Sequence, residues 1–371
     1  MTYDVIVVGL GAMGSAAACH LARRGLRVLG LDRFTPPHAF GSSHGETRII
    51  REAYFEHPVY VPMVQRAYEL WRDLEKESGT TLLRETGGVM IGRPDCDLVK
   101  GARHSAELHG LRYEILTAGE VHERFPALHP ESDMVAVWEP RAGVLFADAC
   151  IDAHLAQARR HGAEMHYEEP MLRWEPEGDG IRVLTAEDEY RARQLIITAG
   201  AWTSTLFLNL TLRVERQVLF WFDDASASEM FAPERCPVHL WRFDGRRFFY
   251  GFPSFGNGVK VAFHHGGEIT TVDTVRAEVA LDEVENIRWA MRRFLPAANG
   301  TLRATSVCVY TNTSDEHFLI DRHPAHPHVW ITSACSGHGF KFSPVIGELL
   351  ADLSQNNRPR FDLSLFRWRV D

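Results

Sequence analysis

Residues 4–14 read Asp4-Val5-Ile6-Val7-Val8-Gly9-Leu10-Gly11-Ala12-Met13-Gly14. The run from Asp4 to Val8 is almost wholly apolar, which is typical of a parallel strand buried on both faces. A GxGxxG turn follows from Gly9 to Gly14, and a helix of small residues comes after it. Glycines at this spacing allow a tight turn, a close approach of backbone to a pyrophosphate, and packing of the helix on the strand.

A second apolar strand, Arg27–Leu31, is predicted after this helix and ends at Asp32. The helix N-terminus offers free N–H groups to phosphates, and an acid at this position accepts ribose hydroxyls. Because strand, helix, second strand and acid follow in this order, we predict a dinucleotide site that includes Gly9, Gly11, Gly14 and Asp32. The acid argues against NADP, but the motif alone does not separate NAD from FAD.

Two later apolar segments, Gln194–Thr198 and Val329–Thr332, are predicted to return to the same sheet. The second leads into the glycine-rich turn 336–341, after which Ser343 is expected as the N-cap of a helix and Pro344 as its first residue. The positive end of this helix would stabilise the anion of a reduced flavin ring. A plain strand–turn–helix is the alternative.

The middle of the chain has a different pattern. From about Gln217 to Thr311, strand-like runs with aromatic residues surround one helical stretch, Leu281–Phe294, which is typical of an antiparallel sheet. We therefore predict an α/β (α+β two-domain) fold with a discontinuous Rossmann-like domain and a substrate domain. The predicted segments are 1–85, 148–216 and 318–371 for the first domain, and 86–147 and 217–317 for the second.

Composition excludes several classes of partner. The formal net charge is -9, which does not favour nucleic acid or an anionic membrane. No apolar run approaches the roughly 20 residues that cross a bilayer, and Tyr3–Val8 lead straight into the glycine motif without the basic region of a signal peptide. The 6 cysteines lack CxxC pairs and metal-type spacing, which indicates a reducing compartment such as the cytoplasm and no metal site.

The segment from Gly41 to Tyr54 carries two arginines. If the chain is helical from Thr47, Arg48 and Arg51 project from nearly one face and suit recognition of a phosphate or a carboxylate. A solvated arginine face with surface salt bridges is the alternative.

Further candidates lie in the second half of the chain. Alternation in the run 258–265 places Lys260 and His264 on one face of a predicted strand, where they would tune proton or oxygen chemistry in a cavity or merely face solvent at a sheet edge. Cys308 lies in an apolar strand, where a cysteine is usually a packed core residue. His338 is flanked by glycines and has no obvious packing role, which suggests close approach of a ligand.

Taken together, these segments resemble the monomeric sarcosine oxidase family, which includes N-methyltryptophan oxidase and the sarcosine/pipecolate oxidases, flavin-dependent amine oxidases of the D-amino-acid-oxidase-like superfamily. The resemblance covers nearly the whole chain, from Tyr3 to about Arg367. Its specific parts are Pro36-Pro37-His38, Gly41-Ser42-Ser43-His44-Gly45 with Arg48 and Arg51, Tyr250-Gly251-Phe252-Pro253, Lys260 with His264, Cys308 through Asp315-Glu316-His317-Phe318, and Ser336-Gly337-His338-Gly339-Phe340-Lys341.

This resemblance implies FAD held covalently through the sulfur of Cys308. It also implies that Arg51 and Lys341 clamp the substrate carboxylate, and that Lys260 assists the reaction of reduced flavin with O2. The implied catalytic residues are Lys260, Arg48, His264 and Tyr250, and the implied substrate-binding residues are Arg51, Lys341, Tyr250 and His338. The implied cofactor-binding residues are Gly9, Gly11, Gly14, Asp32, Arg33, Ser42, Ser43, Arg48, Cys308, Gly337, Gly339 and Lys341.

The implied reaction is oxidation of the C–N bond of a small N-methyl or cyclic secondary amino acid, with sarcosine first, reduction of O2 to H2O2, and hydrolysis of the imine. The same chemistry on N-methyltryptophan, pipecolate or proline is one alternative. A flavin dehydrogenase that does not use O2 is an alternative of another class, and a non-enzymatic flavin-binding subunit is a third. The expected partners are the amine and O2, and the family's usual state is a monomer.

Two departures from the family concern the substrate side chain. Where sarcosine members usually have His-Ala-Tyr-Gly-Glu-Gly after the second arginine, this chain has Glu52-Ala53-Tyr54-Phe55-Glu56-His57. The segment Val238–Arg242 also differs, and Trp241 lies near a position expected to touch the substrate.

Overall fold

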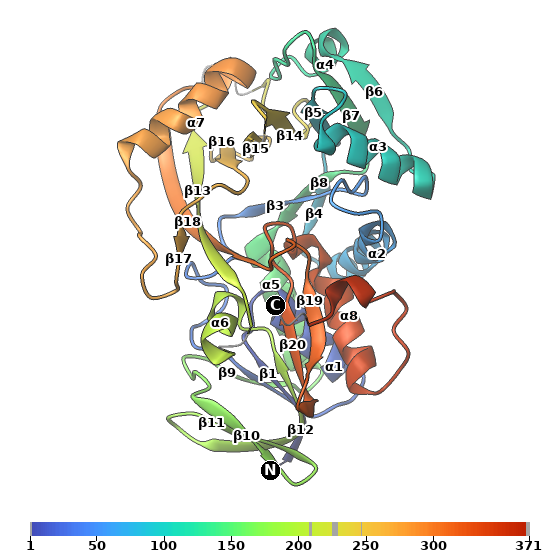
Figure 1. Ribbon diagram of the computed structural model, residues 1–371, viewed down its shortest axis with the longest axis vertical. Coiled ribbons are helices and arrows are strands. Elements are labelled where there is room, and N and C mark those ends of the chain that lie inside the picture. Colours follow the sequence, from blue (N-terminus) through green and yellow to red (C-terminus); the bar gives the residue numbers. More distant parts are fainter. Residues whose placement is uncertain (1, 208–209, 225–228, 246, 369–371) are drawn as a thin grey trace.

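The computed structural model describes residues 2–207, 210–224, 229–245 and 247–368. Figure 1 shows two bodies, a lower one around a largely parallel sheet and an upper one around a largely antiparallel sheet. The extreme ends of the predicted first domain, residues 1 and 369–371, lie outside the described residues, as do 208–209, 225–228 and 246 within the predicted segments.

Strand β1 (Thr2–Val8) lies inside the lower sheet and pairs in parallel with β2 (Val28–Leu31) and β12 (Glu189–Ile197). β12 pairs in parallel with β20 (His326–Ser333), so both segments predicted to return to this sheet do so. Val5 and Val7 face one core and Ile6 and Val8 another, as expected for a strand buried on both faces. The remaining strands of this sheet are β9 (Glu164–His166), β10 (Arg173–Glu177), β11 (Gly180–Leu184) and β19 (Leu319–His323).

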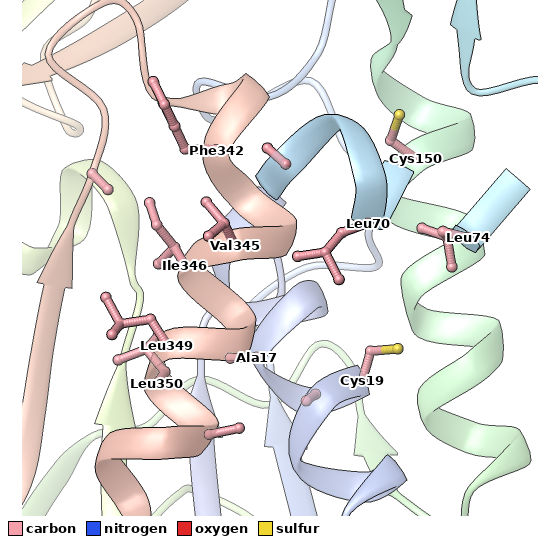
Figure 2. Packing of buried hydrophobic residues seen from close by; sticks show 14 of the residues in the cluster. Ala17, Cys19, Leu70, Leu74, Cys150, Phe342, Val345, Ile346, Leu349 and Leu350 are labelled. Atoms are coloured by element: carbon pink, nitrogen blue, oxygen red, sulfur yellow. The ribbon is translucent and has the colours of Figure 1, made fainter. Parts of the chain in front are cut away.

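Four helices pack together on the Val5 and Val7 side of the lower sheet, namely α1 (Ala12–Arg23), α2 (Tyr60–Ser78), α5 (Ala147–Arg160) and α8 (Ser343–Ser354). Figure 2 shows Val345, Ile346 and Leu349 of α8 beside α1, with Leu70 of α2 and Cys150 of α5 in the same cluster. This packing fixes the N-termini of α1 and α8, both of which lie at the cavity described below.

The start of α8 differs from the prediction. A 3-10 turn, Phe340–Phe342, runs directly into the helix, so Phe342 occupies the N-cap position and Pro344 is the second helical residue. Ser343 already has helical backbone angles, and its buried hydroxyl has no hydrogen-bond partner within the described part of the chain. The prediction that Ser343 caps this helix is therefore wrong.

Within the described residues, the upper sheet has nine strands. Each pair of neighbouring strands in this sheet is antiparallel, except for β14 and β5, which run parallel. Helix α7 (Leu281–Phe294) has the predicted bounds and packs Ile287, Met291 and Phe294 into the core of this body. The strands are β5 (Gly88–Gly92), β6 (Glu114–Thr117), β7 (Val135–Glu139), β13 (Arg213–Phe222), β14 (Val238–Phe243), β15 (Arg247–Gly251), β16 (Val259–Phe263), β17 (Ile269–Thr270) and β18 (Leu302–Asn312). The remaining helices of the described residues are α3 (Asp97–His109), α4 (Ala118–Arg124) and α6 (Thr203–Leu206), with 3-10 turns at Gly200–Trp202, Pro296–Ala298, Phe340–Phe342 and Ser364–Phe366.

Residues Thr47–Ile50 form strand β3, not the helix considered from the sequence. β3 pairs with β8 (Gly143–Phe146), which also pairs with β4 (Leu83–Glu85), and the β-branched residues of Thr-Arg-Ile-Ile favour an extended backbone. Arg48 lies within the strand and Arg51 just beyond it, so they do not share a helix face. Both nevertheless line one cavity.

Two observations bear on the predicted domain segments. The division between 216 and 217 falls inside β13, which is one continuous strand of the upper sheet. The small sheet of β3, β4 and β8 joins strands from segments assigned to different domains. Among the described residues, no helix combines the length and the hydrophobicity of a membrane span.

Candidate active site

A cavity of about 550 Å³ extends from the glycine motif of the lower sheet to the strands of the upper sheet. One end lies beside Gly9, Gly11 and Asp32, and the other lies between Arg51, Tyr250 and Lys341. Of the predicted site residues, the lining includes Gly9, Gly11, Asp32, Arg33, Ser42, Ser43, Arg48, Arg51, Tyr250, His264, Cys308, Gly337, His338, Gly339 and Lys341. Gly14 and Lys260 lie behind the lining.

The end at β1 has the geometry of a dinucleotide cradle. A Cβ at Gly14 would lie 1.8 Å from the carbonyl oxygen of Gly9, so only glycine lets α1 pack this closely on the turn. The carboxylate of Asp32 accepts hydrogen bonds from the N–H groups of Leu10 (2.6 Å) and Phe34 (2.9 Å). Burial raises the pKa of Asp32, although the two hydrogen bonds from Leu10 and Phe34 act to lower it. Backbone at a helix N-terminus and a buried acid at the end of β2 fit a pyrophosphate and a ribose.

Other predicted cofactor residues surround this cradle. The Arg33 guanidinium lies over the rings of Phe34 and Trp202, 5.3 and 5.0 Å from their centroids. The Ser43 hydroxyl accepts a hydrogen bond from the N–H of Ala12 at 3.4 Å, next to the start of α1. The segment before β3 therefore closes over the helix N-terminus.

Arg48 and Lys260 converge on the turn that contains residues 42–47. The Arg48 guanidinium donates to the carbonyl oxygens of Thr47, Ser42 and His44 at 2.7, 2.7 and 2.5 Å. Lys260 Nζ donates to the carbonyls of Gly45 and Thr47 at 2.5 and 2.8 Å and to the Thr47 hydroxyl at 3.1 Å. Burial, with a contribution from Arg48, holds the pKa of Lys260 well below its ordinary value.

The alternative of a solvent-facing edge for Lys260 is excluded. β16 lies between β13 and β15, and Lys260 is 3 % exposed. Lys260 does not line the cavity, but its ammonium group contacts two residues that do, Thr47 and Phe252.

Cys308 lies on β18 opposite Gln217 and lines the middle of the cavity. Its side chain packs with Leu219, Trp221 and Ala262, so it has the packing role expected from the sequence as well as access to the cavity. Burial raises the pKa of the Cys308 thiol, while Arg48 and Lys260 act in the opposite direction. Burial outweighs these two groups, so the thiol form is favoured in the free protein.

At the far end of the cavity, Arg51 and Lys341 lie against the same aromatic ring. The Arg51 guanidinium and Lys341 Nζ are 4.3 and 5.2 Å from the centroid of the Tyr54 ring. The Arg51 guanidinium also donates to both carboxylate oxygens of Glu56, each at 2.7 Å, and to the carbonyl of Ala53 at 2.9 Å. Burial, with a smaller contribution from Arg51, lowers the pKa of Lys341 to about 7. Two buried cations thus face one small volume, where Glu56 already acts as an anion.

His338 has a packing role that the sequence did not reveal. Its ring stacks on Phe318 at 4.7 Å, Nε2 is 3.0 Å from the carbonyl oxygen of Glu316, and Nδ1 is 2.7 Å from the Tyr54 hydroxyl. Burial lowers the pKa of His338 to about 3, so the ring is neutral, Nε2–H donates to the carbonyl, and Nδ1 accepts from Tyr54. Both ring nitrogens are engaged within the protein. The His338 carbonyl, in turn, accepts from Lys341 Nζ at 2.6 Å.

Tyr250, His264 and Tyr310 form the wall opposite these cations. His264 Nδ1 is 3.3 Å from the Tyr310 hydroxyl, and a Cβ at Gly337 would lie 2.6 Å from the His264 ring. Burial raises the pKa of Tyr250 to about 12 and lowers the pKa of His264 well below its ordinary value, so both are neutral near pH 7. Tyr310 was not singled out from the sequence, although it lies two residues after Cys308 on the same side of β18.

Trp241, which the sequence placed near a position expected to touch the substrate, does not itself line the cavity. Trp241 is fully buried in the core of the upper body and stacks on Phe294, with ring centroids 4.7 Å apart. Successive residues of a strand point to opposite faces, and the preceding residue, Leu240, lines the cavity instead. Phe55 and Phe248 also line this end, with their rings in contact at 5.5 Å.

Among the described residues, no group of three or more His, Cys, Asp and Glu side chains is placed to hold a metal ion. None of the six cysteines, all of which lie within the described residues, forms a disulfide.

Comparison with known proteins agrees with this geometry. Residues 4–353 match the family described as FAD dependent oxidoreductase (DAO). The chain is 47% identical to a monomeric sarcosine oxidase from Streptomyces avermitilis, over 98% of this chain and 97% of the relative. It is 34% identical to an N-methyl-L-tryptophan oxidase from Citrobacter koseri, over 99% and 98% of the two chains. The structure of NikD, an unusual amino acid oxidase essential for nikkomycin biosynthesis, has the same fold, with a TM-score of 0.86 and 24% identity over 99% of this chain and 98% of that one.

The backbone cradle, the buried acid at the end of β2 and the long cavity fit FAD, and the family match covers all of these elements. The chain belongs to the FAD-dependent oxidoreductase (DAO) family and, within it, to the sarcosine oxidase-like flavoenzymes.

Proposed function

We propose that this enzyme oxidises the C–N bond of a small N-methyl or cyclic secondary amino acid, with sarcosine as the first candidate. FAD, when bound, supplies the two-electron acceptor, and O2 takes up the electrons to give H2O2. The imine product then hydrolyses in water to an aldehyde and an amine. The observation that carries the proposal is the pair of buried cations, Arg51 and Lys341, on the Tyr54 ring at the end of a cavity that begins at the dinucleotide cradle.

Arg51 and Lys341 would bind the substrate carboxylate. An arginine fork matches a carboxylate in two parallel hydrogen bonds, and an ammonium adds a third charged donor. Nη2 of Arg51 now donates to both oxygens of Glu56 and Nη1 donates to the Ala53 carbonyl, so the substrate carboxylate must displace these acceptors or share the guanidinium with them. The chain Lys341 to Tyr54 to His338 orients the lysine, since Tyr54 accepts from Lys341 at 3.2 Å and donates to His338.

The same charges favour the neutral form of the amine. Only a neutral amine has a lone pair to release as electrons leave, and nearby cations disfavour an ammonium ion. Tyr250, His264 and Tyr310 are neutral in the free protein and offer polar contacts without adding charge. These residues therefore position the amine while the cations position the carboxylate.

Arg48 and Lys260 would act on the cofactor side. A negative charge that develops on the reduced cofactor or on oxygen raises the pKa of a nearby buried lysine and is stabilised by it. Lys260 contacts the lining residues Thr47 and Phe252 and would serve the reaction with O2. This role supports an oxidase over a dehydrogenase.

Cys308 would carry the flavin through a covalent bond from its sulfur. Arg48 and Lys260 partly offset the effect of burial, which raises the pKa of the thiol. The lower body would hold the cofactor and the upper body would cover the substrate. We further propose that the enzyme acts as a monomer in the cytoplasm, where free cysteines persist.

Peroxide release in air from purified holoenzyme tests the proposal, with sarcosine, N-methylalanine, N-methyltryptophan, proline and pipecolate as substrates. Sarcosine should give peroxide and formaldehyde in equal amounts. Preference for N-methyltryptophan or a cyclic amino acid would keep the reaction type but change the proposed substrate. Flavin reduction by sarcosine without peroxide formation in air would indicate a dehydrogenase, and absence of reduction by every amine would refute the proposal.

A further inference from the structure

Glu139 is a buried carboxylate at the end of β7, and it has no place in the chemistry described above. It is 1 % exposed. One carboxylate oxygen accepts a hydrogen bond from the N–H of Glu52 at 2.6 Å, and the other accepts from the N–H of Ala53 at 2.7 Å. These are the two residues that directly follow Arg51. A carboxylate that binds two main-chain N–H groups fixes the direction in which the chain leaves the arginine.

The rest of this loop is also fastened to the upper body. Ser105 of α3 donates to the carbonyl of Tyr54 at 2.5 Å, and His109 Nε2 is 3.0 Å from the carbonyl of Pro58. Lys341, by contrast, lies at the start of α8 in the lower body. The loop after Arg51 is thus held by main-chain hydrogen bonds to the upper body, while the Tyr54 ring packs in the same core as α8. The separation of Arg51 and Lys341 depends on how this loop is held.

We propose that Glu139 is a positioning residue for recognition of the substrate carboxylate: its hydrogen bonds to the N–H groups of Glu52 and Ala53 set Arg51 and Tyr54 at the distance from Lys341 that a carboxylate requires. The inference rests on the proposed function in taking the ligand of these cations to be a carboxylate. Glu139 itself touches neither substrate nor cofactor.

The hold on the loop depends on pH. Glu139 faces Glu52 and Arg51 on the loop and Tyr68 on α2. Burial raises the pKa of Glu139 to about 7, although the two N–H groups and Arg51 act against the shift. As the pH falls through about 7, Glu139 takes up a proton, one of its oxygens becomes a hydroxyl, and the charge-assisted bonds weaken. Anion binding should therefore weaken on the acid side of this pH.

Binding of methoxyacetate to the flavin-loaded enzyme tests this inference. This ligand has the shape of sarcosine with an ether oxygen in place of the amine, so it has no amine to titrate and stays anionic. Its Kd is read from the change in the visible flavin spectrum, without turnover. Glu139→Gln should raise the Kd at pH 8 by roughly tenfold or more, since an amide cannot accept both N–H groups. The variant should also lose the weakening of binding below pH 7.

Two further variants separate positioning from general damage. Glu139→Asp keeps the charge and should retain the acid-side dependence with a smaller rise in Kd. Glu283→Gln is the matched control, because Glu283 also accepts a main-chain N–H, from Ala280 at 2.8 Å, but lies on α7 away from the cavity. Its Kd should stay within about twofold of the parent. The limiting rate of anaerobic flavin reduction by sarcosine should change less in Glu139→Gln than the Kd does.

An unchanged Kd in folded, flavin-loaded Glu139→Gln would overturn the inference, and so would an equal loss in Kd and in limiting reduction rate. If Glu139→Gln does not fold, the parent and Glu139→Asp are compared instead. A methoxyacetate Kd that stays constant from about pH 6 to about pH 7.5 in both proteins would overturn the inference. If methoxyacetate does not bind the parent while sarcosine is oxidised, the carboxylate site of the proposed function fails, and the inference fails with it.

Discussion

Replacement of Lys341 by methionine should weaken the binding of carboxylate ligands. It should also abolish the further weakening of this binding that is expected as the pH rises. Lys341 Nζ donates to the His338 carbonyl at 2.6 Å and to the Tyr54 hydroxyl at 3.2 Å. An ammonium has three N–H groups, so one remains for a ligand. Methionine keeps the length and the apolar stem and removes only the charged donor.

The magnitude follows from the hydrogen bond and the pKa. A hydrogen bond to a charged group contributes about 1.5–3 kcal/mol, or roughly 10- to 150-fold in Kd. The pKa of Lys341 is lowered to about 7, so the ammonium is lost as the pH rises through this value. If the anion binds only the protonated lysine, its Kd rises about tenfold for each pH unit above about 7, until the higher pKa of the complex is reached.

Titration of the flavin spectrum with methoxyacetate from about pH 6 to about pH 9 measures both effects. The parent should bind best near neutral pH, with weakening on the alkaline side from Lys341. Lys341→Met should bind more weakly at pH 7 and show no alkaline weakening. A parent Kd that stays constant between pH 7 and pH 9 would refute the assignment of a charged Lys341 to the ligand.

Four more changes test the other residues. Arg51→Ala should lower kcat/KM for sarcosine by roughly 10²-fold or more, and Arg51→Lys should be impaired as well because the planar fork is lost; an effect within about twofold for Arg51→Ala would contradict the carboxylate role. Cys308→Ala should release FAD on acid precipitation, whereas the parent polypeptide should stay yellow and fluorescent in a denaturing gel; free FAD from a fully loaded parent would exclude the covalent bond. Phe55→Gly should raise kcat/KM for N-methylphenylalanine relative to sarcosine, since the contact of Phe55 with Phe248 narrows this end of the cavity; an unchanged ratio would mean that another residue sets the size limit. Lys260→Met should slow flavin reoxidation by orders of magnitude and flavin reduction by much less, as stopped-flow traces of the two half-reactions would reveal; equal losses would assign Lys260 a structural role.

The lower body could be predicted well because its signals are local. A buried strand, three glycines and an acid follow one another within residues 4–32, and each has one physical reason to be there. The returning strands β12 and β20 were recognisable as continuous apolar runs. The long helix α7 was found with its observed bounds because its apolar residues recur at helical spacing.

Errors arose where a local signal competed with a distant partner. Thr47–Ile50 became a strand because β8, almost a hundred residues later in the chain, pairs with it. The sequence marked the neighbourhood of Trp241 but not which residue faces the cavity: Leu240 lines it and Trp241 points into the core, since successive residues of a strand face opposite sides. Ser343 has the residue type of a cap, but the preceding 3-10 turn removed its function as one.

Residues that act through tertiary contacts could not be found from their own sequence neighbours. Glu56 is a plain acid in a loop until the fold brings its carboxylate onto Arg51. Glu139 gains its role from main-chain groups 86 and 87 positions earlier in the chain. His338 had no obvious packing role between its two glycines, but Tyr54 and the Glu316 carbonyl occupy both ring nitrogens. Only the assembled cavity reveals these partnerships.

The most direct test of the central claim is an anaerobic half-reaction followed by exposure to oxygen. Flavin-loaded enzyme is mixed with excess sarcosine without O2, the visible flavin band is followed to completion, and air-saturated buffer is then added. The account predicts rapid bleaching on the first mixing, full return of the band on the second, and one H2O2 for each flavin reoxidised. A band that sarcosine does not bleach, or a bleached band that returns only over many minutes without peroxide, would contradict it.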